Sequence, residues 1–458
     1  VREHAAMSPS PSTNQRPPRI FLGLTEVSGY YAQLRKGFVE LGIECVHIPI
    51  QAHRFAYDEA HDMGWPARLA RFFVKRRVAV PEAAHWRRRA WLVPVTLTRV
   101  ILFVWAVRRF DVFIMGGGSS FFRFWDLPVL RWLGRRVIYV LHGTDARPAY
   151  LDGSFYQERH AATRQNDLDP PPLDDEFIDA YVSATAVRHR DVRWIERHAH
   201  TVVCGPGFAQ LLDKPFVNFA AVGIPFSPPD TRLPEPRPPD GRVRILHATS
   251  DMVGRGTRIT RRIIEELIER GLPIDFIVMT GQPHLRVLEE LQACDFVVDG
   301  QWADTPMAGF ATESARFGKP VVMGGYYAAN VRRDMPPETI PPTCFTTPDQ
   351  MQTTIERLVL DAEYRRQVGD EMRRFVLEAW TPRSVAAKYL RLLKGSAPES
   401  WWNDPHRNLY HLGGGLSGDR IRAIVRAIVA RHGEQALLLD HNPALRDMLM
   451  AFVRETRN

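Results

Sequence analysis

A proline-rich segment divides the chain into two runs of alternating strand-like and helix-like sequence. Residues 222–241 hold seven prolines and several charged residues, which is typical of an extended, semi-rigid connection. On both sides of it, short apolar runs alternate with segments of helical periodicity, the pattern of βα units built on parallel sheets. The length of 458 residues also exceeds one ordinary hydrophobic core. We therefore predict an α/β fold of two doubly wound, Rossmann-like domains that face each other across a cleft.

The predicted domain boundaries follow from this division. The N-terminal residues are polar and rich in proline and serine, without the apolar core of a secretion signal, so a disordered tail is expected there. The chain is then divided into a tail (1–18), a first Rossmann-like domain (19–222), the linker (223–242), a second Rossmann-like domain (243–379), a helix crossing back to the first domain (380–395) and a helical extension (396–458).

The first domain opens with a predicted strand, turn, helix and strand. The strand RIFLGL at 19–24 precedes a turn centred on Gly29, a helix over 32–41 and a second strand over 43–50. The turn has no GxGxxG, so the dinucleotide-binding pattern is absent. Because loops at the carboxyl ends of parallel strands form the binding edge of such sheets, Gly29 is expected to line a cleft.

A second candidate site follows the predicted strand RVIYVL at 136–141. The next residues, HGTDARP, place His142, Asp145 and Arg147 within six positions. These three side-chain types can together bind a sugar or phosphate, or move a proton. A hydrogen-bonded loop histidine is the alternative interpretation of His142.

In the second half, residues 295–325 predict a strand, a glycine-bearing loop, a short helix and another strand. Gly309 precedes the helix, which carries Glu313 in its first turn. A helix start presents free backbone N–H groups that suit an anionic phosphate, and a carboxylate accepts hydrogen bonds from sugar hydroxyls. Glycine and glutamate are also common as plain helix caps.

Residues 65–110 interleave arginine with tryptophan, phenylalanine and leucine, as in RFFVKRR at 71–77 and WRRRAWLV at 86–93. One interpretation is an interfacial segment, with apolar side chains in lipid and arginines on anionic headgroups. Residues 65–110 are accordingly predicted as a contact with an anionic membrane surface.

Two other interpretations of this region stay open. A membrane-spanning helix over 91–107 would be at the short limit of a span, and Pro94 and Arg99 interrupt it. A buried core helix over 95–107 would lead into the predicted strand 111–115, and it is compatible with a basic, membrane-facing hairpin before it.

The overall composition limits the classes of binding partner that we expect. The net charge of +8 and the isoelectric point near 9.4 favour anionic partners, although an arginine-rich composition alone gives the same balance. Nucleic acid is excluded from our prediction, because the aromatic residues lie in apolar runs rather than on a recognition motif. The four cysteines are scattered without metal-ligand spacing, which favours a reducing, cytoplasmic location.

Three motifs in the second half carry a family resemblance. HATSDMVGRGT, FVVDG and GFATESARFGKPVV resemble, in this order, the nucleotide-sugar domain of GT-B glycosyltransferases, above all the retaining family 4 type. The resemblance implies that Arg255 binds the donor diphosphate, where the family commonly has lysine, and that Glu313 binds the ribose. It also implies that His142 lies near the transferred sugar. Asp299 and Asp304 are both candidates for the acidic residue of the family.

The resemblance thus assigns catalytic roles to His142, Arg255 and Glu313. The implied donor-binding residues are Gly29, Gly254, Arg255, Gly256, Thr257, His284, Gly309, Phe310, Ala311, Thr312 and Glu313, and the implied acceptor-side residues are His142, Asp145 and Arg147.

The expected activity is transfer of a sugar from a UDP- or GDP-linked donor to a glycan or lipid-linked acceptor. The resemblance implies retention at the anomeric carbon. No cluster of histidine and aspartate with metal-ligand spacing occurs in the sequence, so a metal-independent reaction without a cofactor is expected, with the nucleotide-sugar as a substrate. A cytoplasmic enzyme on the inner face of the membrane is expected. A nucleotide-sugar epimerase of the same fold and a non-catalytic nucleotide-sugar-binding module are the alternatives.

Overall fold

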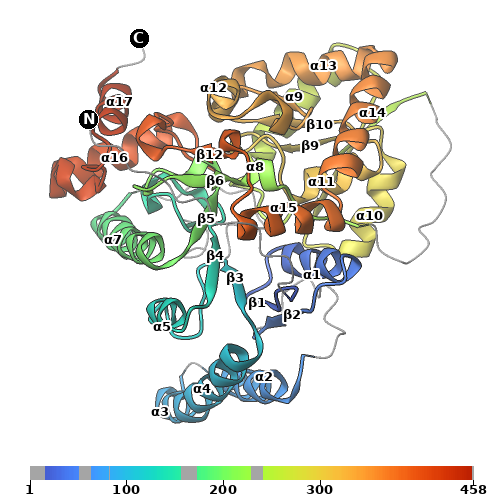
Figure 1. The fold of residues 1–458 in the computed structure, drawn as a ribbon. Coiled ribbons are helices and arrows are strands. Elements are labelled where there is room, and N and C mark those ends of the chain that lie inside the picture. Colours follow the sequence, from blue (N-terminus) through green and yellow to red (C-terminus); the bar gives the residue numbers. More distant parts are fainter. Residues whose placement is uncertain (1–15, 51–62, 82, 156–172, 228–240, 456–458) are drawn as a thin grey trace, which may run out of the picture.

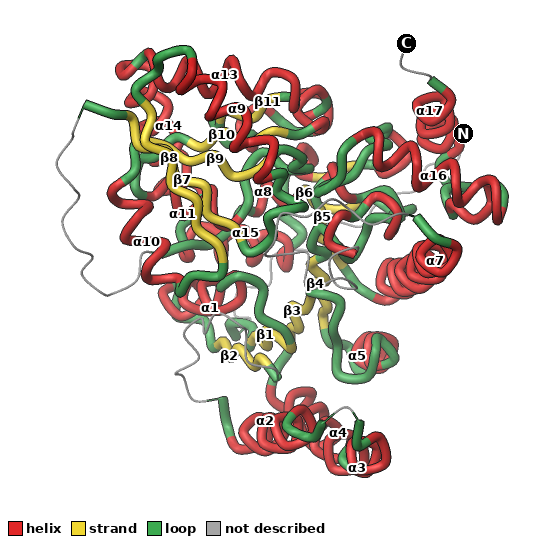
Figure 2. Tube along the Cα trace, turned by 180° about the vertical axis from the view of Figure 1, so that it is seen from behind, coloured by secondary structure: helices red, strands yellow, loops and turns green. Residues whose placement is uncertain are grey.

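The structure is a computed structural model that describes residues 16–50, 63–81, 83–155, 173–227 and 241–455. Most of the predicted N-terminal tail and of the proline-rich linker lies outside these residues. The described chain forms two separate sheets with helices packed around each, so the predicted α/β class with two doubly wound domains is confirmed. Figures 1 and 2 show the two halves from opposite sides.

The first sheet has seven strands in the order β12-β6-β5-β4-β3-β1-β2, and all pairs are parallel except that of β12 with β6. The interior strand β1, with the sequence IFLGL, is buried at every position, as expected of a parallel strand covered on both faces. The strands are β1 (Ile20–Leu24), β2 (Cys45–Pro49), β3 (Val112–Gly116), β4 (Arg136–Val140), β5 (Thr201–Cys204), β6 (Phe216–Asn218) and β12 (Trp402–Asn403).

The second sheet has five parallel strands in the order β11-β10-β9-β7-β8. The strands are β7 (Val243–Thr249), β8 (Ile274–Thr280), β9 (Phe296–Gly300), β10 (Val321–Gly324) and β11 (Cys344–Thr346). The helices that accompany it are α9 (Thr257–Glu269), α10 (His284–Ala293), α11 (Gly309–Arg316), α12 (Val331–Asp334), α13 (Met351–Leu360) and α14 (Ala362–Ala379).

The helices around the first sheet are α1 (Tyr30–Glu40), α2 (Trp65–Val78), α3 (His85–Ala90), α4 (Leu92–Arg109), α5 (Asp126–Trp132), α7 (Asp175–His198) and α8 (Phe219–Val222). Helix α1 begins two residues earlier than the sequence pattern predicts. The cause is Glu26, whose carboxylate accepts hydrogen bonds from the backbone N–H groups of Tyr31 at 3.3 Å and Ala32 at 2.9 Å.

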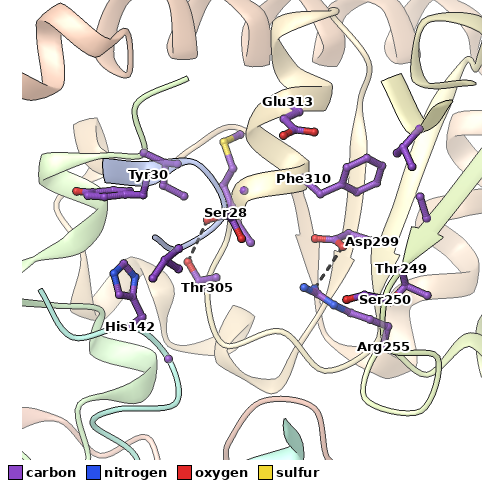
Figure 3. A pocket seen from close by; sticks show the side chains of 18 of the residues that line it. Ser28, Tyr30, His142, Thr249, Ser250, Arg255, Asp299, Thr305, Phe310 and Glu313 are labelled. Atoms are coloured by element: carbon purple, nitrogen blue, oxygen red, sulfur yellow. Dashed lines mark hydrogen bonds and ion pairs between the residues drawn. The ribbon is translucent and has the colours of Figure 1, made fainter. Parts of the chain in front are cut away.

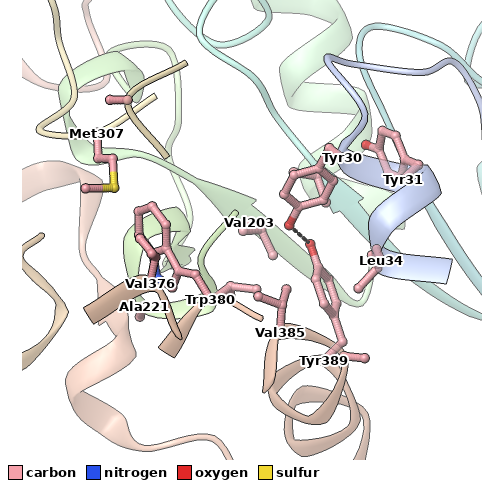
Figure 4. Close-up of a cluster of buried hydrophobic side chains, with 14 of the residues drawn as sticks. Tyr30, Tyr31, Leu34, Val203, Ala221, Met307, Val376, Trp380, Val385 and Tyr389 are labelled. Atoms are coloured by element: carbon pink, nitrogen blue, oxygen red, sulfur yellow. Dashed lines mark hydrogen bonds between the residues drawn. The ribbon is translucent and has the colours of Figure 1, made fainter. Parts of the chain in front are cut away.

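Helix α15 (Pro382–Lys394) follows the second sheet in sequence but packs against α1 of the first domain. The Tyr389 hydroxyl lies 2.8 Å from that of Tyr30 in a buried cluster, shown in Figure 4. A Cβ atom on Gly37 would lie 1.9 Å from the carbonyl oxygen of Pro382, so the two helices touch backbone to backbone. Trp380, which precedes α15, is buried in the same cluster.

The residues after α15 return to the first domain. Trp402 and Asn403 form β12, an edge strand that the sequence does not predict, and Trp401 beside it is buried. Helices α16 (Gly418–His432) and α17 (Pro443–Arg454) follow, and α16 packs against α7. The predicted helical extension is therefore an integral part of the first domain's surface (Figure 1).

Helix α4 is buried on one face only. Its buried residues are Val95, Thr98, Leu102 and Ala106, so the predicted core helix is present. Residues 85–109 also form the one helical stretch in the described chain that is long and apolar enough to cross a membrane by length and composition, with 22% of the window buried.

Candidate functional site

A cavity of about 520 Å³ lies between the two domains, at the carboxyl ends of both sets of parallel strands (Figure 3). This volume is in the range of a small-molecule site. The loops that follow β1 and β4 line it from the first domain, and those that follow β7, β8 and β9 line it from the second. The predicted site residues on its wall are His142, Arg255, His284, Gly309, Phe310 and Glu313.

Arg255 lies in the loop between β7 and α9. Its guanidinium Nη1 is 3.3 Å from the Oδ1 of Asp299, which is buried at the end of β9. The next residue, Gly256, has a φ of +65° and is packed so closely on Gln301 that a Cβ would lie 2.7 Å from the Gln301 Cγ. The tight turn and the ion pair together hold a half-exposed cation against the cavity.

The first turn of α11 faces the same part of the cavity. The helix begins at Gly309 after Ala308, and its first N–H groups have no carbonyl partner within the helix. Thr312 is different, because its backbone N–H donates to the Ala308 carbonyl at 2.9 Å. Thr312 is one of the donor-binding residues that the resemblance implies, but its backbone N–H is not free to bind a ligand. The N–H groups without a helical carbonyl partner are those of Gly309, Phe310 and Ala311.

Glu313 is fixed by His284, the first residue of α10. The His284 Nε2 lies 3.0 Å and 3.1 Å from the two carboxylate oxygens. This hydrogen bond raises the pKa of His284 above its ordinary value of 6.5, against an opposing effect of burial. Both side chains line the cavity, so a carboxylate of fixed orientation faces the space beside the α11 start.

His142 faces the cavity from the first domain. Its ring has edge-on contacts with Tyr30, Tyr31 and Phe219, and its Nε2 is 3.3 Å from the Tyr31 hydroxyl. Burial among these rings lowers its pKa to about 4, so the imidazole is neutral near pH 7. The backbone N–H of His142 donates to the Asp145 carboxylate at 3.0 Å.

Asp145 and Arg147 are not among the residues that line the cavity. Burial raises the pKa of Asp145 to about 6. Arg147 is buried and forms an ion pair with Asp304, which does line the cavity. The two acidic candidates thus have separate partners, with Asp299 on Arg255 and Asp304 on Arg147.

The other predicted residues shape the loops rather than line the space. Gly29 has a φ of +81° and precedes α1, between the cavity residues Ser28 and Tyr30. Thr257 is buried, and its hydroxyl lies 2.8 Å from the Nε2 of His247. Gly254, Gly256, Ala311 and Thr312 are likewise absent from the wall.

Several wall residues were not predicted. The hydroxyl residues Ser28, Thr249, Ser250 and Thr305 and the Tyr30 ring all line the cavity. Thr249 and Ser250 follow β7 in the motif HATS, so their position at the carboxyl end of a strand was a usable signal. Within the described residues, no group of three or more histidine, cysteine, aspartate or glutamate side chains is arranged to hold a metal ion.

No family model and no curated protein matches the sequence. Solved structures with partial similarity include the glycosyltransferase SnogD from Streptomyces nogalater (15% identity, 82% of this chain and 100% of that chain, TM-score 0.40). Anabaena HepE in complex with UDP-glucose is 11% identical, and the match covers 82% of this chain and 99% of HepE (TM-score 0.43). S. aureus MnaA with UDP is 10% identical, and the match covers 83% of this chain and 99% of MnaA (TM-score 0.40). At such scores the function of the cavity has to be inferred from its own residues.

Proposed function

We propose that the protein is a glycosyltransferase of the GT-B type that binds a nucleoside-diphosphate sugar in the interdomain cavity. The observation that carries this proposal is the convergence of three groups on one wall. The Arg255 cation, the free N–H groups at the start of α11 and the Glu313 carboxylate all face the same space from the second domain. Their chemistry matches the diphosphate and ribose of one ligand.

Departure of a nucleoside diphosphate adds one negative charge to a group that already carries about two, so the site has to stabilise this extra charge in the transition state. Arg255 can donate two hydrogen bonds to phosphate oxygens, and the α11 start adds oriented N–H donors and the positive end of the helix dipole. A cation and a helix start together do the work that a divalent metal does in other transferases, so we propose a metal-independent reaction. Retention at the anomeric carbon is proposed separately, from the resemblance of the sequence motifs to the retaining family 4 type.

His142 lines the opposite wall of the cavity, and we propose that the transferred sugar binds beside it. Its neutral imidazole can hold a sugar hydroxyl by a hydrogen bond, whereas a pKa of about 4 makes it a weak base. We assign the first domain, with His142, to the acceptor. A glycan or lipid-linked acceptor and a UDP- or GDP-linked donor complete the proposal.

The test combines donor binding with one substitution. A thermal-shift panel of UDP-, GDP-, ADP- and dTDP-sugars is expected to give a selective rise in Tm for one nucleotide. With that donor, Arg255→Ala is expected to reduce kcat by about 10²–10³-fold, because the lost cation acts on the leaving group in the transition state. The matched control is Arg262→Ala, an exposed arginine on the neighbouring α9. Normal turnover by Arg255→Ala would refute the assignment.

One observation favours a second candidate, a nucleotide-sugar epimerase. Burial raises the pKa of Asp304, which lines the cavity from the second domain, and of Asp145, which lies behind His142 in the first domain, so ionisable groups with raised pKa lie on both sides of the cavity. An epimerase converts the donor to its isomer without any acceptor. Incubation of the donor with and without candidate acceptors, followed by NMR of the sugar, separates the two reactions: an isomer formed from the donor alone indicates epimerisation, and a donor consumed only with an acceptor present indicates transfer.

A further inference from the structure

The outer face of α4 is an apolar stripe with no covering element in the described structure. Val93, Leu97, Val100 and Val104 are all exposed, and their spacing of three and four residues puts them on one side of the helix. The buried residues Val95, Thr98, Leu102 and Ala106 lie on the opposite side. The helix is therefore apolar on both faces but packs against the protein with only one.

Arginines stand at both ends of this stripe. Arg87 and Arg89 on α3 precede it, and Arg108 follows it; all three are exposed. Trp86, also on α3, is 75% exposed. At 1.5 Å per residue the stripe from Val93 to Val104 is about 16 Å long. An apolar stripe with tryptophan and arginine at its ends is the pattern of a helix that lies flat in a membrane interface.

The net charge of residues 63–110 also fits a membrane surface as the partner. Residues 63–110 contain eleven lysine and arginine residues and a single acidic residue, Glu82. Each basic residue near an anionic bilayer adds to the attraction, and the effect is screened by salt. A surface that is both positively charged and apolar suits contact with anionic lipid headgroups and with the acyl chains beneath them.

A spanning orientation does not fit the packing. Phe110 is fully buried directly after α4, and β3 begins at Val112, where it pairs with β1 and β4. A helix that crossed a bilayer would have to withdraw its buried face, including Leu102 and Ala106, from the domain. Arg99, in the middle of the helix, would add a charged group at the bilayer centre.

From these observations we infer that the α3–α4 face (Trp86, Arg87, Arg89, Val93, Leu97, Val100, Val104 and Arg108) docks the protein on an anionic lipid bilayer. The apolar stripe enters the boundary of the acyl chains and the arginines contact the headgroups. This inference does not depend on the proposed sugar transfer, because the face shares no residue with the interdomain cavity.

The experiment is flotation of the full-length protein with vesicles. We expect it to float with phosphatidylcholine–phosphatidylglycerol vesicles at 50 mM NaCl, and at least tenfold less with pure phosphatidylcholine vesicles or at 500 mM NaCl. The charge variant Arg87→Glu/Arg89→Glu/Arg108→Glu and the apolar variant Val93→Ser/Leu97→Ser are each expected to lose most binding. Val93 and Leu97 are 72% and 59% exposed, so the fold does not depend on them.

Control variants carry the same kinds of change elsewhere, three charge reversals and one leucine replacement. Arg262→Glu/Arg366→Glu/Arg407→Glu alters three exposed arginines by the same charge, and Leu360→Ser removes a leucine that is 67% exposed. Both controls are expected to float like the unmodified protein. Equal losses in the controls, or failure of the unmodified protein to float at low salt, would overturn the inference.

Two further measurements keep the test decisive. Sedimentation velocity without vesicles shows whether the face instead pairs two copies of this chain; a dimer that Val93→Ser/Leu97→Ser dissociates, with no flotation, would overturn the inference. If a variant unfolds, quenching by brominated lipid replaces flotation. The unmodified protein is then expected to lose tryptophan fluorescence on anionic vesicles, and Trp86→Phe is expected to reduce this loss.

Discussion

Arg255, Glu313 and Arg147 share one structural device: each is held by a partner of opposite charge on a different segment. Asp299 orients Arg255, His284 orients Glu313, and Asp304 pairs with Arg147. Such partners fix the rotamers before a ligand arrives, so less conformational entropy is lost on binding. The three pairs therefore describe a site that is largely formed without its substrate.

The Glu313 carboxylate gives the first prediction at this scale. Glu313→Gln keeps the size of the side chain but removes the charge and one of the two acceptor oxygens. Because a hydrogen bond to a charged group contributes about 1.5–3 kcal/mol, the affinity for the nucleoside diphosphate is expected to fall by roughly 10- to 100-fold. Isothermal titration calorimetry measures this change. Glu265→Gln, exposed on α9, is the control and should bind normally.

The ion pair of His284 and Glu313 predicts a pH dependence of stability. The folded-state pKa of His284 is raised above its ordinary value of 6.5, so the protonated form is favoured in the folded protein. Its stabilising contribution is fully present below pH 6.5 and is lost as the pH rises through the folded-state pKa. The difference in unfolding free energy between the unmodified protein and His284→Gln should therefore be larger at pH 5.5 than at pH 9.

The His284 side chain is 30% exposed, so solvent screens its ion pair with Glu313. We therefore expect the pair to contribute at most about 1 kcal/mol to the free energy of unfolding. Urea unfolding at the two pH values measures it. In the background of Glu313→Gln the pH dependence assigned to His284 should disappear. A difference that stays the same at both pH values would contradict the role of the pair.

At the scale of elements, the contact of α1 with α15 leaves no room for an added side chain at Gly37. Gly37→Ala would place a methyl group 1.9 Å from the Pro382 carbonyl oxygen, and neither helix backbone can yield without displacing the other. Overpacking of this kind costs about 1–3 kcal/mol, and a lower Tm in calorimetry is the expected result. Glu40→Ala, at an exposed position of the same helix, should leave Tm nearly unchanged.

The elements that the sequence predicted are those with a strong local pattern. Helix α9 spans Thr257–Glu269, and its apolar residues recur at helical spacing, so this helix can be read from the sequence. Strand β12 has two residues and no periodicity; it exists because Trp402 and Asn403 meet β6, a pairing between distant parts of the chain. Local pattern carries no information about such a pairing.

The residues of the candidate site also fall into two groups, those that local sequence predicts and those that only the folded structure shows. Arg255, Glu313 and His142 lie on the cavity wall, as expected of residues in loops at the carboxyl ends of strands. Ser28 and Thr305 also lie in loops at the carboxyl ends of strands, β1 and β9, but the local sequence does not indicate which hydroxyl of each loop reaches the cavity. Their place on the wall follows from the way the two domains face each other, which only the folded structure supplies.

At the scale of the whole molecule, the C-terminal extension bridges the two domains. The backbone N–H of Gly415 donates to the Trp302 carbonyl of the second domain at 2.8 Å, while the Gly414 carbonyl accepts from Gly153 of the first at 2.9 Å. Beside this crossing, the Arg147–Asp304 ion pair also joins the two domains. The extension thus helps to set the distance across the cavity.

Gly414 is the point at which this bridge can be tested. A Cβ there would lie 2.5 Å from the Arg147 Nη1 and 3.0 Å from the Asp304 Oδ2, so Gly414→Val must displace the interdomain ion pair. With the pair displaced, the domains are expected to separate at this edge. The affinity for the nucleoside diphosphate should fall about tenfold, because the two walls no longer meet the ligand together.

Small-angle scattering and calorimetric titration of the same sample measure both consequences, an increased radius of gyration and weaker binding. Ser400→Val, in an exposed part of the extension, introduces the same side chain without a buried neighbour and should change neither. If Gly414→Val binds the nucleotide normally with an unchanged radius, the bridge does not control the cavity. A larger radius with normal binding would instead show that the donor needs only the second domain, as the placement of Arg255 and Glu313 on one wall allows.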